Sequence, residues 1–175
     1  MLRTCILLAS ALALPAAAAI AEPSGLAYSL RTLPTEEPAF ALSANGVQVY
    51  QCQQVPGGAS YAWFLVAPDA TLYDGAASVA RMASPNHWES LYDLSSVSGV
   101  PLRMQAAGAD NLPWELMHAV PIGDSGMFAG VSSIQRVNTA GGAPPRGACD
   151  DTHVGDEARV AFTADYYFYK PRAAG

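Results

Sequence analysis

Apolar and polar residues alternate along most of the chain beyond residue 38, which is the pattern of strands with one buried face. The clearest run is 159–169, where every second residue from Val160 to Phe168 is apolar or aromatic. The run 61–67 is apolar on both faces and predicts a strand in the middle of a sheet. Other runs predict strands at 40–44, 47–53, 70–73, 78–82, 87–92, 100–105, 112–120 and 127–137.

Turn residues separate these runs and favour hairpins over long crossover connections. Residues 45–46 (Asn-Gly) predict a tight turn between the first two strands, and residues 74–75 (Asp-Gly) predict a second. Residues 123–126 (Gly-Asp-Ser-Gly) fit another hairpin turn; the same string surrounds the nucleophile of trypsin-like proteases, whose other motifs are missing here. No window has the period of an amphipathic helix. We therefore expect one all-β domain, an antiparallel β-sandwich or β-barrel.

The N-terminus has the three parts of a secretory signal peptide. Arg3 supplies a positive charge, residues 5–14 form an apolar stretch, and residues 19–21 (Ala-Ile-Ala) make a small-residue cleavage site. The stretch is shorter than the roughly 20 residues that a helix needs to cross a bilayer, so a permanent anchor is the weaker alternative. We expect cleavage to remove 1–21 and to leave 22–175 as a single secreted or periplasmic domain.

The charge of the chain argues against two classes of partner. The net charge is −6 at pH 7, and it becomes −7 when Arg3 leaves with the signal peptide. An acidic protein repels the phosphates of nucleic acids and the headgroups of anionic lipids. We expect no nucleic-acid partner, and no membrane span after signal removal.

Two cysteines, Cys52 and Cys149, remain after signal removal, in a compartment where thiols oxidise. Only one intramolecular pairing is possible, so we expect a disulfide between them; the alternative is two unrelated thiols. Cys149 lies in 138–157, a stretch rich in glycine and proline that predicts a long loop. The disulfide would tether this loop to the strand that carries Cys52.

Five separate stretches carry a family resemblance that extends over most of the chain beyond the signal peptide. They are GVQVYQC (46–52), WFLVAPDATLYD (63–74), LPWELM (112–117), FAGVSSIQRVNTAGGAPP (128–145) and TADYYFY (163–169). With these stretches the chain resembles the domain-of-unknown-function family 3455, found in secreted bacterial and fungal proteins. The resemblance implies no particular biochemistry. One segment departs from it, because the family's H-Y-A-G-P-T-W-E reads RMASPNHWE here and lacks the expected His.

Some fungal members of that family carry a malate dehydrogenase label, which this sequence does not support. A nicotinamide enzyme of that kind needs a glycine-rich turn between a strand and a helix, followed by an acidic residue that binds the ribose. Neither a G-x-G-x-x-G motif nor an alternation of strands and helices occurs here. We expect no cofactor.

Two tryptophan–glutamate pairs, Trp88-Glu89 and Trp114-Glu115, are the first candidates for a ligand site. The two carboxylates could flank a sugar-sized groove, one as an acid and one as a base or nucleophile. Aromatic residues beside carboxylates also occur in noncatalytic carbohydrate sites. Alternation offers the interpretation that we favour, in which each tryptophan faces the core and each glutamate faces water.

Arg136, Asn138 and Thr139, where the long loop is expected to begin, are the second group of candidates. Loops on a rigid β-scaffold often carry binding residues, which favours a ligand contact here. The alternative is a turn that needs the backbone freedom of Gly141 and Gly142. The sequence leaves both open.

Metal binding is the less favoured interpretation of the remaining polar residues. The long loop offers oxygen ligands for a hard cation, but their spacing matches no calcium loop, so a solvated acidic loop is simpler. These loop residues are Asp150, Asp151, His153, Asp156 and Glu157. Zinc binding would need the fold to bring together three histidines from separate segments, namely His87, His118 and His153.

These observations favour a noncatalytic binding or interaction module whose partner is a small molecule, a glycan or a protein. The alternative is an extracytoplasmic hydrolase, acting on carbohydrate through Glu89 or Glu115 or using a metal ion held by the acidic loop. The two interpretations differ in whether a glutamate is needed for turnover.

Overall fold

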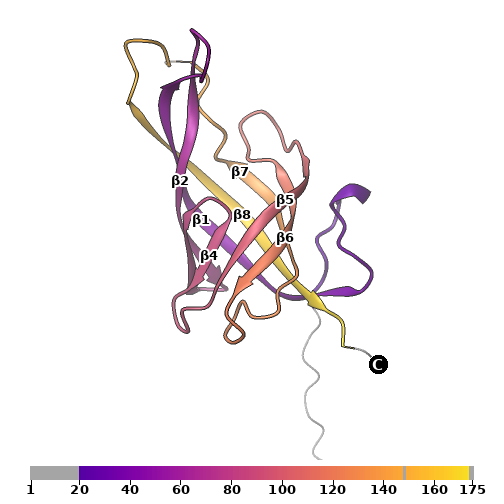
Figure 1. Cartoon of the computed structure of the whole chain (residues 1–175). Coiled ribbons are helices and arrows are strands. Elements are labelled where there is room, and N and C mark those ends of the chain that lie inside the picture. The colour runs from indigo at the N-terminus through magenta and orange to yellow at the C-terminus, as the bar shows by residue number, and fades with distance from the viewer. Residues whose placement is uncertain (1–19, 148, 174–175) are drawn as a thin grey trace, which may run out of the picture.

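The computed structural model describes residues 20–147 and 149–173, which form one closed antiparallel barrel (Figure 1). Each strand pairs with its neighbours in sequence, and the last strand pairs with the first to close the ring. The predicted all-β antiparallel fold is confirmed, and of the two architectures left open it is the barrel. The elements are η1 (Tyr28–Leu30), β1 (Glu36–Gln54), β2 (Tyr61–Asp74), β3 (Ala77–Ser84), β4 (His87–Ser90), β5 (Ser96–Gln105), β6 (Trp114–Ile122), β7 (Ser133–Gly141) and β8 (Glu157–Pro171).

Residues 1–19 of the predicted signal peptide lie outside the described residues. Cleavage of the chain therefore stays a prediction. No helix within the described ranges has both the length and the apolar character that a membrane crossing requires.

The hairpin predicted at residues 45–46 is wrong, because both residues lie inside the 19-residue strand β1. Gly46 pairs with Ala70 on one side and with Phe162 on the other. A Cβ atom on Gly46 would overlap the Asp69 carbonyl oxygen and would lie 2.5 Å from the Ala70 Cα. The glycine therefore allows a close approach of two strands rather than a turn.

The runs 61–67 and 70–73 likewise form one strand, β2, whereas the turn at residues 74–75 is confirmed by the short β2–β3 connection. The predicted strand 127–137 begins later, at Ser133. Before that residue the chain turns into the end of the barrel and buries Phe128 completely.

That end of the barrel is closed by a cluster of aromatic side chains: Phe40, Trp88, Phe128 and Phe168. The rings of Phe40 and Phe168 stack at a centroid distance of 4.7 Å, and Phe128 lies 5.3 Å from Phe168. The loop that carries Phe128 is fixed by Asp93, which accepts a 2.7 Å hydrogen bond from the backbone N–H of Met127. We call this region the sealed end.

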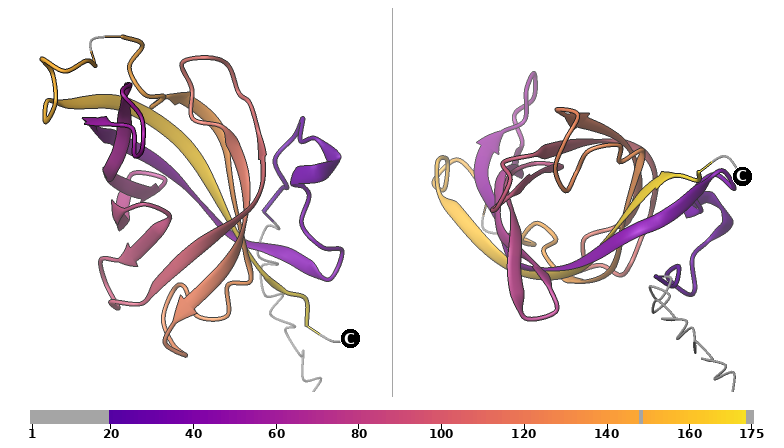
Figure 2. Two further views of the ribbon diagram at one scale, coloured as in Figure 1. Left: turned by 45° about the horizontal axis from the view of Figure 1, so that its top comes forward. Right: turned by 90° about the horizontal axis from the view of Figure 1, so that it is seen from below.

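β1 and β8 run side by side along the whole barrel, from one end to the other (Figure 2). At the sealed end Phe40 pairs with Phe168, and towards the other end Gln48 pairs with Val160. Beyond Gln51, where the pairing with β8 ends, β1 and β2 continue as a two-stranded ribbon to the connection at residues 55–60.

The disulfide between Cys52 and Cys149 is confirmed, with a Cα–Cα distance of 5.4 Å. It ties the end of β1 to the β7–β8 connection, and the backbone of Cys52 also exchanges hydrogen bonds with Gly155 and Asp156. The predicted loop is shorter than expected, because residues 138–141 belong to β7 and the connection covers 142–156. The register of β7 against β8 shifts between Val137 and Ala140, and the strand continues beyond this irregularity.

The segment before β1 packs against the outside of the barrel, where Leu30 is buried. The carbonyl of Leu30 accepts a hydrogen bond of 2.6 Å from Gln135 Nε2, and Gln135 Oε1 accepts one from the Tyr169 hydroxyl. Tyr169 is thus buried under this segment, beyond the barrel wall.

Candidate functional site

A cavity of about 160 Å³ lies at the end of the barrel opposite the sealed end. β2 pairs with β3 only from Ala70 to Asp74, so the earlier part of β2 runs on without that neighbour. The turn between β3 and β4 forms the facing rim. We call this hollow the mouth cavity, and its lining residues are Gln48, Leu65, Pro68, Met82, Pro85, Asn86, Leu112, Glu115 and Arg136.

A buried ion pair forms part of the wall of the mouth cavity. Glu115 on β6 and Arg136 on β7 are direct neighbours in the strand register, and their side chains are 4% and 9% exposed. Arg136 Nη2 lies 2.8 Å from Glu115 Oε2, and Arg136 Nε donates a 3.0 Å hydrogen bond to the Pro113 carbonyl. A buried ion pair is rarely more stabilising than apolar side chains of similar volume. Its presence at a cavity therefore calls for another explanation than stability.

Burial raises the pKa of the Glu115 carboxyl above its usual value, and the neighbouring Arg136 guanidinium opposes that shift. Burial also raises the pKa of two nearby hydroxyls, Tyr50 and Tyr166, again opposed by Arg136. The Tyr50 hydroxyl donates a 2.6 Å hydrogen bond to the Gly142 carbonyl. Against the effect of burial, Arg136 is thus the cation that lowers the pKa of all three of these groups, Glu115, Tyr50 and Tyr166.

Gln48 is a further polar residue in the same wall, only 3% exposed. Within the described ranges its Oε1 has no hydrogen-bond partner, and the same holds for Trp88 Nε1 and Gln105 Oε1. Leaving a buried polar group unpaired costs about 1–3 kcal/mol. Gln48 is therefore the lining residue of the mouth cavity whose polar group the protein itself leaves least satisfied.

The structure separates the two tryptophan–glutamate pairs. Trp88 is fully buried in the core, and Glu89 points outwards, where its carboxylate lies 2.6 Å from the guanidinium of Arg81. At this pair the expectation of a buried tryptophan and an exposed glutamate is correct. Hydrogen bonding from Arg81 is the main cause that lowers the pKa of Glu89.

At the second pair the same expectation is wrong. Glu115 shares its face of β6 with Met117 and Ala119, which point into the barrel, so Trp114 lies on the opposite face and is only partly buried. Glu115 therefore points inwards and Glu89 outwards. The two carboxylates do not flank one groove.

Arg136 lines the mouth cavity, whereas Asn138 and Thr139 do not. The Thr139 hydroxyl donates a 2.6 Å hydrogen bond to the carbonyl of Leu112, a cavity residue. The Asn138 side chain donates one of 2.8 Å to Asp165 on β8. Gly141 and Gly142 have φ angles of 72° and 84°, which is the backbone conformation that favours glycine.

The acidic loop forms its own internal contacts. Asp150 Oδ1 accepts hydrogen bonds from Thr152 and lies 2.6 Å from His153 Nδ1. The hydrogen bonds from Thr152 are the main cause that lowers the pKa of Asp150 to about 2, and Asp150 raises the pKa of His153. Across the described part of the chain, no three histidine, cysteine or acidic residues converge in a way that could hold a metal ion.

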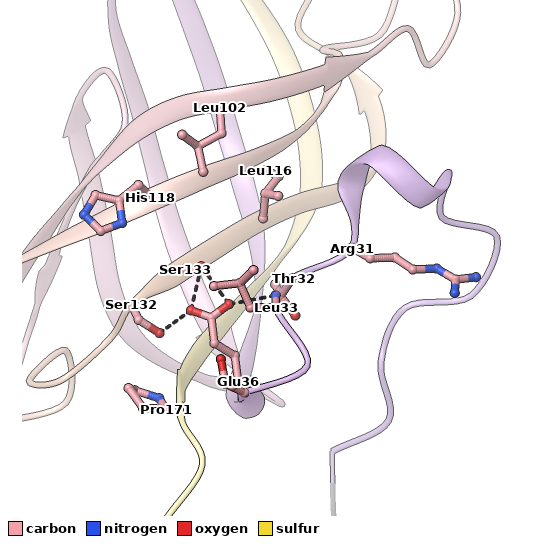
Figure 3. A pocket seen from close by; sticks show the side chains of 11 residues that line it. Arg31, Thr32, Leu33, Glu36, Leu102, Leu116, His118, Ser132, Ser133 and Pro171 are labelled. Carbon is pink, nitrogen blue, oxygen red and sulfur yellow. Dashed lines mark hydrogen bonds between the residues drawn. The ribbon is translucent and has the colours of Figure 1, made fainter.

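A second hollow of about 440 Å³, the outer groove, lies outside the barrel between the N-terminal segment and β5–β7 (Figure 3). Its apolar wall is formed by Leu33, Leu102 and Leu116, and His118 stands at its edge. The Glu36 carboxylate accepts hydrogen bonds from the Ser132 and Ser133 hydroxyls and from the Leu33 backbone N–H. Figure 3 shows Arg31 pointing away from the groove.

Comparison with known proteins assigns a family but no activity. A family model described as "Protein of unknown function (DUF3455)" matches residues 34–106 and 82–170. No curated protein and no solved structure matches the chain. Because the two matched ranges together cover residues 34–170, the chain belongs to this family of proteins of unknown function.

Proposed function

We propose that this protein is an exported, noncatalytic binding protein that takes up a small molecule in its mouth cavity. The observation that carries the proposal is the unpaired, buried Gln48 beside the buried Glu115–Arg136 ion pair, all three lining one cavity. Small-molecule sites favour the mouths of β-barrels, where apolar walls hold a few polar groups that orient the ligand. The mouth cavity has this composition.

Its size supports a small molecule rather than a glycan chain or a protein. The volume of about 160 Å³ is close to that of an engineered cavity of about 150 Å³ that binds benzene. A protein partner would need a broad surface of about 800 Å² on this side of the complex. The cavity is suited to one compact ligand.

Export is supported by the N-terminal sequence and by the disulfide. Residues 1–21 have the composition of a secretory signal, and the Cys52–Cys149 bond is of the kind that persists in oxidising compartments. Secretion and a periplasmic location both agree with these features.

The hydrolase alternative has less support. Hydrolysis of a glycosidic bond needs two carboxyl groups about 5–10 Å apart across the substrate. Glu115 faces Arg136 inside the barrel, whereas Glu89 is bound to Arg81 on the outside. A metal-assisted reaction lacks a cluster of ligands within the described ranges.

The test is a fragment screen by NMR, with two matched variants of β2. Leu65 lines the mouth cavity and Val66 does not, yet they are neighbours with similar exposures of 43% and 47%. Ligands should shift the amide signals of Gln48, Met82 and Leu112. Leu65→Trp should weaken binding at least about tenfold, or 1.4 kcal/mol, and Val66→Trp should not.

Two results would count against the proposal. Ligand shifts confined to the outer groove, around Leu33, Leu102 and Leu116, would place binding elsewhere. Equal affinity in Leu65→Trp and the unaltered protein would show that the mouth cavity is not the site.

A further inference from the structure

We infer that the ligand of the mouth cavity is a compact, electrically neutral molecule with an apolar body and one group that both donates and accepts hydrogen bonds, such as a hydroxyl or a carboxamide. This inference rests on the proposed function and deepens it. It follows from the charge of the cavity, from the hydrogen-bonding capacity of its polar residues, and from the nature of its walls.

The charge of the cavity favours a neutral ligand. The guanidinium of Arg136 is paired at 2.8 Å with the carboxylate of Glu115, and the other lining residues carry no charge. A charged ligand would leave water without finding a free counter-ion in the wall. Burying an unpaired charge in this way is strongly unfavourable.

The polar residues of the wall require both a donor and an acceptor. A guanidinium only donates, a carboxylate only accepts, and a side-chain amide does both. Gln48 is buried with its Oε1 unpaired. A hydroxyl or carboxamide can donate to one wall group and accept from another, which a pure donor or a pure acceptor cannot do.

The rest of the wall limits the number of polar groups that a ligand can bury. Apart from Asn86, the remaining lining residues are aliphatic or contain sulfur: Leu65, Pro68, Met82, Pro85 and Leu112. A sugar ring would bury several hydroxyls against these apolar side chains. None of the lining residues is aromatic, so the wall also lacks a flat surface on which a sugar could stack. The walls therefore favour an apolar ring or branched chain over a carbohydrate.

The inference is tested with four probes that share one skeleton: benzyl alcohol, toluene, benzylammonium and benzoate. Each is titrated at pH 7 into the chain isolated from its export compartment with its disulfide intact, and the amide signals of Gln48, Met82 and Leu112 are followed by NMR. Benzyl alcohol should bind with a Kd on the order of 1 mM, as expected for so small a ligand. The other three probes should bind at least about tenfold more weakly.

A pair of glutamine variants assigns the contact. Gln48→Leu removes the unpaired oxygen and should keep the fold, while it weakens benzyl alcohol binding about tenfold and leaves toluene binding unchanged. Gln53→Leu is the matched control, because Gln53 lies on the same strand and is exposed. It should leave the affinity for both probes unchanged.

The outcomes separate this inference from the proposed function. If benzylammonium, benzoate or toluene binds in the mouth cavity as tightly as benzyl alcohol, the ligand class is wrong and the binding function stands. If Gln48→Leu leaves alcohol binding unchanged, the assigned contact is wrong. If none of the four probes shifts the three amide signals at concentrations well above 1 mM, the inference and the proposed function both fail.

Discussion

The two ends of the barrel use the same strands in opposite ways. At the sealed end, Phe40, Phe128 and Phe168 pack with ring centroids 4.7–5.9 Å apart. At the mouth end, the same barrel encloses Gln48 and the Glu115–Arg136 ion pair around a cavity. Hydrophobic burial explains the first arrangement and not the second.

The side chains at the sealed end favour folding, whereas the polar groups at the mouth end are not explained by stability. Apolar side chains of similar volume at positions 115 and 136 would be expected to give equal or greater stability. Polar groups that reduce stability are typical of functional sites, where natural proteins depart from the rules that favour folding. The comparison between the ends therefore supports a binding site at the mouth end.

Truncation at the sealed end should have the largest effect on stability. Phe168 is fully buried and contacts the rings of Phe40, Trp88 and Phe128. Phe168→Ala should lower the free energy of unfolding by about 4 kcal/mol, because it removes these contacts and leaves a cavity. Urea denaturation followed by circular dichroism measures the loss.

A surface aromatic residue provides the control for this variant. Tyr28 is 87% exposed, so Tyr28→Ala should change the free energy of unfolding by no more than about 0.5 kcal/mol. A similar small loss in Phe168→Ala would contradict the close packing of the sealed end.

Breaking the ion pair at the mouth end should have the next largest effect. Arg136→Met leaves the Glu115 carboxylate buried without its cation and should destabilise the fold by about 3 kcal/mol. The double variant Glu115→Leu/Arg136→Met should recover most of that loss, because it removes both buried charges. Such a recovery at the mouth end, with no equivalent at the sealed end, would sharpen the contrast between them.

An exposed ion pair offers the matched control. Arg159 Nη2 and Asp69 Oδ2 lie 2.6 Å apart, close to the 2.8 Å of the buried pair, but their side chains are 54% and 72% exposed. Arg159→Met should therefore change stability by less than about 1 kcal/mol. If it changes stability as much as Arg136→Met, burial is not what distinguishes the two pairs.

The sequence predicted the fold class well, and its errors have physical causes. Alternation identified the strands, and two free cysteines in an expected oxidising compartment identified the disulfide. The turn at residues 45–46 was wrong because a glycine that serves close strand contact looks the same in sequence as a turn glycine. Long barrel strands were predicted as two shorter ones where residues typical of turns interrupted the pattern, Asn45-Gly46 in β1 and Pro68-Asp69 in β2.

The site was only partly predictable. Glu115 and Arg136 were among the candidates, but their contact depends on the pairing of β6 with β7, which no local pattern encodes. Gln48 was missed, although a signal existed. It shares the alternation of Leu42, Ala44 and Tyr50, all buried, so a polar residue at that position was out of place. The outer groove had no signal, because it depends on how residues 31–36 pack against distant strands.

The smallest expected effect is a difference in pH dependence between two glutamates. Burial raises the folded-state pKa of Glu115 above its unfolded value. The favourable contribution of Glu115 to the free energy of unfolding is therefore complete below its unfolded-state pKa of about 4.3. It is lost as the pH rises through the folded-state pKa. Glu89 has a lowered pKa because of Arg81, so its contribution is present above about 4.3 and is lost as pH falls.

Glu115→Gln and Glu89→Gln should consequently change the pH profile of stability in opposite directions. With rising pH, the free energy of unfolding of the unaltered protein should fall relative to Glu115→Gln and should rise slightly relative to Glu89→Gln. Urea denaturation at a series of pH values from about 4 to 8 measures both differences. Because both variants replace a carboxyl by an amide of nearly equal size, slopes of the same sign would show that the Glu115 carboxyl is not in a desolvated site, and the contrast between the two ends of the barrel would lose its electrostatic basis.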